Sequence, residues 1–137
     1  RVVPSERGEV VLGADTVVVD DGLIIGQPVD RADAERILRR LSGGEHDVLT
    51  GVAIVDVDTG RRDLLLDRAH VTVGPIPETE ITAYLDSGQW RGKAGAYNLA
   101  ERLQAGWPIR VEGDPGTVMG LPMVRLGERL RAFAAAR

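Results

Sequence analysis

The sequence has 137 residues, and 17 basic against 21 acidic side chains give it a formal net charge of −4. This length suits one domain with its own core, so we expect a single domain over residues 1–137. The absence of cysteine excludes disulfides and thiolate chemistry. The two histidines, His46 and His70, are too few for a zinc site of the usual kind.

Charge and hydropathy also argue against two classes of partner. An acidic chain without a basic cluster lacks the footprint that nucleic-acid binding requires. No apolar run approaches the roughly 20 residues that span a bilayer, and residues 1–7 lack the apolar core of a signal peptide. We therefore expect a cytoplasmic protein without a nucleic-acid or membrane partner.

The first predicted elements are strands. Residues 9–12 are mostly apolar and predict a short strand that ends at Gly13. Residues 17–19 and 23–25 are apolar runs joined by an Asp-Gly turn, which predicts a hairpin. Neither run alternates polar with apolar residues, so we expect both faces of these strands to be covered.

The remaining predicted elements follow from the periods of the apolar residues and from turn residues. In chain order they are a helix capped by Asp30 and stopped by residues 42–44, strands over 48–57 and 64–73, a helix over 78–87, an irregular stretch over 88–108, a strand over 109–111, a turn over 113–116 and a helix that starts at Pro122. Such an order predicts mixed α and β structure in one domain.

Asp15 is the first candidate for chemistry, because it lies in Gly13-Ala14-Asp15-Thr16 between two apolar runs. A carboxylate at the end of a buried strand lies at the edge of a sheet, where ligands bind in α/β proteins. It is suited to hold Mg²⁺ or to accept a proton from water that attacks phosphorus. The alternative is a turn aspartate that bonds to its own backbone.

Three glycine-containing stretches supply further candidates. Gly and Pro on either side of Gln27 fix a tight turn from which Gln27 projects. The glycines before His46 permit an anion to approach backbone N–H groups, although such stretches are more often helix C-caps. Lys93 lies in a loop of small residues and is suited to neutralise a phosphate, the alternative being a solvated lysine.

These stretches are more informative as an ordered set than singly. In order they are Gly13-Ala14-Asp15-Thr16-Val17-Val18, Gly26-Gln27-Pro28, Leu41-Ser42-Gly43 with His46-Asp47-Val48 and Thr50-Gly51-Val52, Lys93-Ala94-Gly95-Ala96-Tyr97, and Gly113-Asp114 with Val118-Met119-Gly120-Leu121-Pro122. Their order and intervals resemble those of the Maf (septum formation) family, from about Val10 to the final helix.

The resemblance implies an inosine-triphosphatase-like α/β fold, in which a mixed sheet with flanking helices forms two lobes around a cleft. It also implies hydrolysis of a nucleoside triphosphate between its α- and β-phosphates with a divalent metal, Mg²⁺ or Mn²⁺. By similarity, Asp15 is the catalytic proton acceptor and a metal ligand. A homodimer is compatible with the resemblance.

Thr16 resembles the family branch that acts on dTTP and UTP, which carries Thr after the aspartate where the other branch tends to have Gln. A second specificity position, Gln or Glu in the family, falls on Ala100 by direct counting. The interval from Ala94 to Gly113 is one residue longer than usual, and this insertion brings Glu101 to that position instead.

Two departures from the family pattern concern the phosphates. The family's Gly-Lys-Pro lysine, which would contact phosphate, is Gln27 here, a hydrogen-bond donor without charge. The family's N-terminal Ser-x-Ser-Pro-Arg-Arg segment is absent, and the sequence lacks an initiator Met. We therefore expect a chain truncated at its N-terminus, with little activity by itself and with apolar residues near 10–12 and 17–19 partly uncovered.

Three functions stay open from the sequence. The first is a nucleoside triphosphate pyrophosphatase for dTTP or UTP, with Asp15 as its catalytic residue and Thr16, Gln27, Lys93, and Ala100 or Glu101 near the substrate. The second is a non-catalytic, nucleotide-binding or regulatory remnant of that family. The third is a structural fragment that binds no ligand.

Overall fold

The computed structural model describes residues 2–5 and 8–135. Its elements are β1 (Val2–Ser5), β2 (Gly8–Asp20), β3 (Leu23–Ile25), α1 (Arg31–Leu41), β4 (Glu45–Asp56), β5 (Arg62–Val73), α2 (Glu78–Ser87), the 3₁₀ turn η1 (Ala94–Ala96), α3 (Leu99–Gln104), β6 (Ile109–Glu112), α4 (Pro115–Val118) and α5 (Met123–Ala135).

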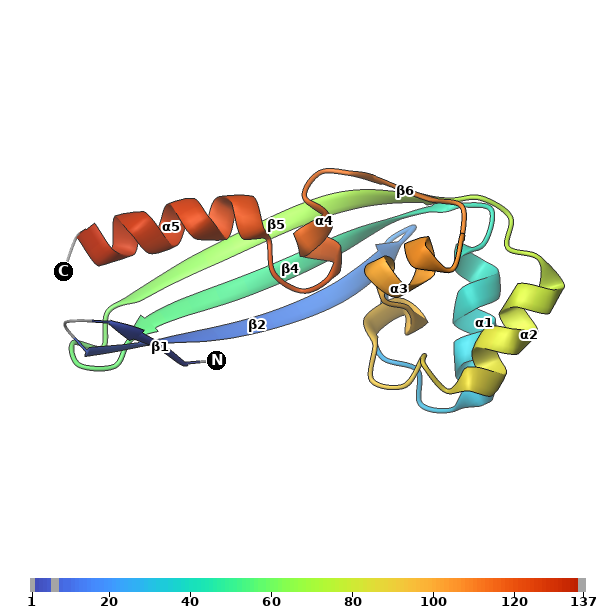
Figure 1. Ribbon diagram of the computed structural model, residues 1–137, viewed down its shortest axis with the longest axis horizontal. Coiled ribbons are helices and arrows are strands. Elements are labelled where there is room, and N and C mark those ends of the chain that lie inside the picture. Colours follow the sequence, from blue (N-terminus) through green and yellow to red (C-terminus); the bar gives the residue numbers. More distant parts are fainter. Residues whose placement is uncertain (1, 6–7, 136–137) are drawn as a thin grey trace.

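The strands form one sheet in the order β1-β2-β4-β5-β6, with β3 also paired to β2. Each described pairing is antiparallel. Figure 1 shows β2, β4 and β5 as long strands that run the length of the molecule, with α5 along one end and α1 to α3 gathered at the other. The predicted α/β fold, with a sheet and flanking helices, is confirmed, but the described strand pairings are antiparallel and do not form the mixed sheet that was expected.

Side chains alternate between the two faces of this sheet, and helices cover only one face. Every second residue of β4, from His46 to Asp56, is buried, whereas the residues between them are half-buried. On the other face of β5, Leu64 and Leu66 are 73% and 65% exposed. The expectation that both faces of the β2–β3 hairpin are covered is wrong, because Ile24 lies on a three-residue edge strand and is 68% exposed.

The covered face holds two apolar clusters. The larger lies beneath α1 and α2 and includes Leu38 and Val48, whereas the smaller lies beneath α5 and includes Ile54 and Leu126. Leu12 and Val18 belong to these clusters and are buried, but the other residues of 10–12 and 17–19 are half-buried, so the expectation that these runs are partly uncovered is confirmed for the latter. The most exposed apolar side chains of the sheet lie on β3 and β5.

A polar row separates the two clusters. Thr16 of β2 pairs with Thr50 of β4, and Thr50 pairs with Asp67 of β5. The strand register therefore carries polar side chains across the covered face of the sheet, between the two apolar clusters.

Helix boundaries follow from caps that the sequence carries. The side chain of Asp30 accepts a hydrogen bond from the backbone N–H of Asp33 at 2.8 Å and so caps α1, as predicted. Gly88 ends α2 in the left-handed conformation at φ 73°. Leu126 and Phe133 of α5 are buried as predicted, but Met123 is 59% exposed.

Two predicted local structures are wrong. The stretch expected to be irregular contains η1 and α3, because Asn98 accepts a hydrogen bond from the backbone N–H of Glu101 and acts as an N-cap. Asp15 does not end a strand, since β2 continues through it and pairs Asp15 with Gly51. Among the described residues, no helix is both long and apolar enough to cross a membrane.

Candidate active site

The candidate residues Asp15 and Thr16 lie on an open stretch of sheet edge. On the outer side of β2, β1 pairs with residues 8–11 and β3 pairs with residues 18–20. Between them, residues 13–17 face no strand among the parts of the chain that the structure describes. Such a gap offers backbone N–H and C=O groups to a ligand.

Asp15 and Thr16 point to opposite faces of the sheet, because successive side chains of a strand alternate. Asp15 is exposed on the uncovered face, beside a shallow hollow of about 520 Å³. Gly51, Ala53 and Leu66 line this hollow with Asp15, and most of its surface is apolar. The small side chains there leave the carboxylate open to solvent and to a ligand that crosses the edge.

Thr16 lies on the covered face, in a cavity of about 180 Å³. Strands β2 and β4 form the floor of this cavity. Its walls come from residues 92–98 on one side and from Val118 and Met119 at the end of α4 on the other. We call it the Thr16 pocket. It has room for one aromatic ring, not for a whole nucleotide.

A chain of hydrogen bonds ties Thr16 to the protein interior. The hydroxyls of Thr16 and Thr50 lie 2.8 Å apart, and the Thr50 hydroxyl donates to the backbone carbonyl of Thr117 at 2.7 Å. The Thr117 hydroxyl donates to Asp67 Oδ2 at 2.5 Å, and Arg125 contacts Asp67 Oδ1 at 3.0 Å. Thr50 and Thr117 are fully buried, so this end of the pocket is rigid.

Asp67 is the ionised end of that network. Partial burial acts to raise the pKa of its carboxyl, but the hydrogen bonds from Thr117 and Arg125 outweigh burial and hold the pKa below its usual value. Asp67 is therefore a carboxylate at neutral pH and accepts both hydrogen bonds. The Thr117 hydroxyl is in this way fixed as a donor toward Asp67.

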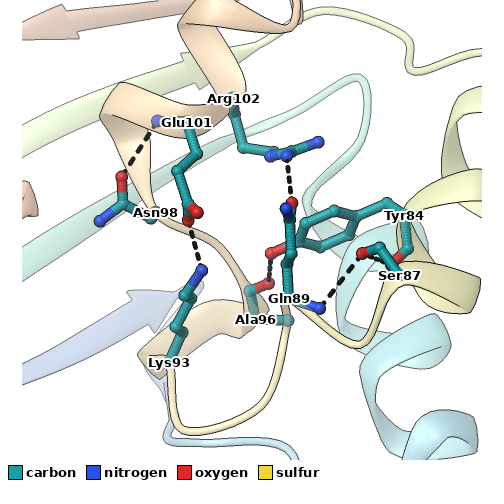
Figure 2. Close-up of polar contacts among 8 residues, drawn as sticks. All are labelled: Tyr84, Ser87, Gln89, Lys93, Ala96, Asn98, Glu101 and Arg102. Carbon is teal, nitrogen blue, oxygen red and sulfur yellow. Dashed lines mark hydrogen bonds and ion pairs between the residues drawn. The ribbon is translucent and has the colours of Figure 1, made fainter.

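Lys93 also lines the Thr16 pocket, and its ammonium group forms an ion pair with Glu101 of α3. Figure 2 shows this pair beside Asn98, whose side-chain oxygen accepts from the backbone N–H of Glu101 at 3.0 Å. Ala100 is exposed on the same helix. Of the two residues predicted for the second specificity position, Glu101 is thus the one that contacts a pocket residue.

Gln27 lies elsewhere. It lines a separate hollow of about 280 Å³ with Asp33, Arg36 and Arg40. A hydrogen bond from the backbone N–H of Gly95 to the carbonyl of Gly26, at 3.1 Å, connects the two regions through the backbone. The structure thus brings Thr16, Lys93 and Glu101 together but places Gln27 and Asp15 outside the Thr16 pocket.

Behind the pocket, His46 Nε2 lies 2.8 Å from the hydroxyl of Tyr97, which is a lining residue. Burial lowers the pKa of His46 to about 4 and raises that of Tyr97 well above its usual value. Both groups are therefore neutral at physiological pH. His46 is 3% exposed and supports Tyr97 from within, a position unsuited to a general base.

The Maf-like protein family model matches residues 1–133 of the sequence. The chain belongs to the Maf-like family. It is 48% identical over 122 residues to the dTTP/UTP pyrophosphatase of Dechloromonas aromatica, which covers 88% of this chain and 59% of the relative. It is 44% identical over 132 residues to the enzyme of that name from Geobacter sulfurreducens, covering 94% and 67%.

A third relative, the dTTP/UTP pyrophosphatase of Salinibacter ruber, is 40% identical over 136 residues, which are 98% of this chain and 67% of the relative. The chain thus spans about two thirds of the length of such Maf-like relatives, and less of some. What their names state belongs to those proteins.

A metal ion fits this site only together with a ligand. No group of three or more His, Cys, Asp or Glu side chains suited to hold a metal occurs in residues 2–5 and 8–135. Mg²⁺, however, is commonly held by one or two carboxylates together with substrate phosphates and water. The exposed carboxylate of Asp15 suits that arrangement.

Three residues around the pocket were given no role from the sequence. Thr50 lies between Val48 and Val52 on the inward face of β4, and a polar residue between two apolar ones on that face was a usable signal. Thr117 and Asn98 contribute through a tertiary contact and a helix cap, and neither follows from periodicity.

Proposed function

We propose that the protein is a nucleoside triphosphate pyrophosphatase that hydrolyses dTTP and UTP to the monophosphate and pyrophosphate. One observation carries the proposal: a single open stretch of β2 presents a carboxylate on one face and a hydroxyl-lined, ring-sized pocket on the other. The names of the Maf-like relatives supply the substrate class.

The nucleotide is proposed to straddle the sheet edge. Its base enters the Thr16 pocket, and its phosphates pass over the edge of β2 toward Asp15. Lys93 lines the pocket, and its ammonium group is ion-paired with Glu101. A phosphate would therefore compete with Glu101 for Lys93, which favours a polyanion over a neutral nucleoside.

In the proposed reaction, Asp15 accepts a proton from the attacking water. A bond forms between the water oxygen and the α-phosphorus, and the bond from the α-phosphorus to the bridging oxygen of the β-phosphate breaks. Pyrophosphate leaves with the bonding electrons. A divalent cation, Mg²⁺ or Mn²⁺, would neutralise phosphate charge beside Asp15. We infer a cytoplasmic location, where free nucleoside triphosphates are present.

A nucleotide panel tests this proposal. The intact protein is incubated with dTTP, UTP, CTP, ATP and GTP at equal concentration with Mg²⁺, and monophosphate and pyrophosphate are quantified. We expect dTTP and UTP to give the fastest turnover, with both products in equal amounts, and chelation of the metal to stop it. Release of orthophosphate, or a series led by GTP, would contradict the assignment.

A second candidate is a nucleotide-binding protein without catalysis. Two observations favour it: Glu101 neutralises Lys93, and Gln27 carries no charge. Calorimetric titration with dTTP and Mg²⁺ distinguishes the two, because a binding protein would retain dTTP without releasing pyrophosphate.

A further inference from the structure

The inference concerns how the Thr16 pocket distinguishes one pyrimidine from another, and it rests on the proposed function. We propose that hydrogen bonds within the protein fix two of the pocket's polar groups, Thr16 as an acceptor and Asn98 as a donor. This pair matches the imide edge of uracil and thymine, a ring N–H beside a carbonyl. It opposes the matching edge of cytosine, where an unprotonated ring nitrogen lies beside an amino group.

The acceptor follows from counting hydroxyl protons. A threonine hydroxyl has one proton to donate and two lone pairs to accept with. Thr50 donates its proton to the carbonyl of Thr117, which has none to return. The contact between Thr16 and Thr50 at 2.8 Å therefore requires Thr16 to be the donor. With its proton directed to Thr50, Thr16 offers only lone pairs to the pocket.

The donor follows from the cap of α3. The side-chain oxygen of Asn98 accepts from the backbone N–H of Glu101 at 3.0 Å. This contact identifies which end of the amide is oxygen and holds it toward the helix. Asn98 lines the pocket, and with its oxygen engaged by the helix, its NH₂ group is the end of the amide left to contact a ligand. Figure 2 shows the two ends of Asn98, with the oxygen toward the Glu101 backbone and the nitrogen away from it.

Thr50 is on this account a positioning residue, since it acts on the base only through Thr16. It is fully buried and lies outside the pocket lining, so its effect on selectivity cannot come from contact with the ligand. The two groups together select against cytosine by leaving an acceptor facing an acceptor and a donor facing a donor. Such mismatches discriminate strongly in a buried site.

The test measures binding of UMP, N3-methyl-UMP and CMP to the intact protein by calorimetry, since monophosphates are not turned over. We expect the wild-type protein to bind UMP at least about tenfold more tightly than the other two. The Asn98→Asp variant retains an N-cap oxygen but replaces the donor by an acceptor. Its ratio of UMP to CMP affinity should fall at least about tenfold.

The control is Gln104→Glu, which adds the same charge to an exposed position of α3 outside the pocket. Its UMP to CMP ratio should equal that of the wild type, although both affinities can fall together. Thr50→Val frees the Thr16 proton and should lower the ratio of UMP to CMP affinity about threefold or more. Thr50→Ser keeps the hydroxyl and should therefore keep the wild-type ratio. Should Thr50→Val fail to fold, Asn98→Asp and Thr50→Ser still decide the question.

An unchanged ratio in Asn98→Asp, or equal binding of UMP and N3-methyl-UMP by the wild type, would overturn the inference. If dTTP and UTP are nonetheless hydrolysed, the proposed function stands and only the selection mechanism fails. If the wild-type protein binds no nucleotide and releases no pyrophosphate, both fail.

Discussion

His46 is a buried imidazole whose Nε2 contacts Tyr97 and whose Nδ1 is buried without a hydrogen-bond partner among the described residues. Burial lowers its pKa from 6.5 to about 4 in the folded protein. Below about pH 6.5 the unfolded chain therefore binds a proton at His46 that the folded chain does not bind. Stability from this residue is complete above the unfolded pKa and is lost as the pH falls toward 4.

We accordingly predict that the free energy of unfolding drops by ~2 kcal/mol through His46 between about pH 7.5 and about pH 5. His46→Gln should remove most of that drop, as measured by urea unfolding at both pH values. The same pH dependence in variant and wild type would show that His46 ionises freely in the folded state.

His70 provides a control of opposite sign. Hydrogen bonds first to Asp47 and then to Glu45 raise its pKa, so its contribution is fully present below about pH 6.5 and is lost as the pH rises through the higher folded value. His70→Gln should therefore make the protein more sensitive to acid, whereas His46→Gln makes it less sensitive. Changes of the same sign in both variants would refute the assignment.

Among single residues, the sequence motifs pointed to Thr16 and Lys93, which line one pocket in the structure, and suggested Glu101 beside them. They did not place Asp15 on the opposite face, because that depends on β2 running unbroken through Gly13. The role of Asn98 was also hidden, since its meaning comes from a cap on a helix that the small residues of 88–108 did not predict.

The 3₁₀ turn η1 packs closely on the sheet. Gly95 has φ 67°, and a Cβ there would lie 2.7 Å from Cγ2 of Val18 in β2. Gly92 has nearly the same φ, 72°, but a Cβ there would meet nothing within 4 Å. Alanine substitutions at these two glycines therefore separate the cost of a left-handed backbone from the cost of a steric clash.

We predict that Gly92→Ala lowers the free energy of unfolding by about 1 kcal/mol, whereas Gly95→Ala lowers it by at least about 1 kcal/mol more. Gly95→Ala should also weaken nucleotide binding, since η1 lies between Lys93 and Tyr97 of the pocket. Chemical unfolding of both variants measures the difference. Equal losses would indicate that η1 does not contact β2 as described.

Strong local signals predicted α1, α2, the β4–β5 pair and α5, because each carries a clear period and a cap or turn residue. The order of the strands and the burial of their side chains were harder to predict from the sequence. The apolar residues of β3 and β5 gave no sign that one face of the sheet is uncovered, because alternation is blurred where leucines occupy both faces, as at Leu64, Leu65 and Leu66.

At the scale of the whole molecule, two apolar clusters share three continuous strands. Ile54 belongs to the smaller cluster and Leu38 to the larger, and both are fully buried. Because β2, β4 and β5 contribute residues to both clusters, we propose that residues 1–137 fold as one cooperative domain.

Ile54→Ala and Leu38→Ala should each lower the free energy of unfolding by about 2–5 kcal/mol while preserving a single transition. Circular dichroism in the far and near ultraviolet should report the same midpoint for each variant. Two separated transitions, each shifted by only one of the substitutions, would instead establish two independent units.

The central claim is that the open edge of β2 joins two functions, with chemistry at Asp15 and base recognition at Thr16. The decisive measurement compares Asp15→Asn with the wild type in the intact protein, recording both pyrophosphate release from dTTP and affinity for dTMP. We predict a turnover at least about a hundredfold lower, as expected for loss of a general base. The affinity for dTMP and the melting temperature should be preserved, because Asp15 lies outside the Thr16 pocket. Turnover within about tenfold of the wild type would remove Asp15 from the reaction and contradict the account.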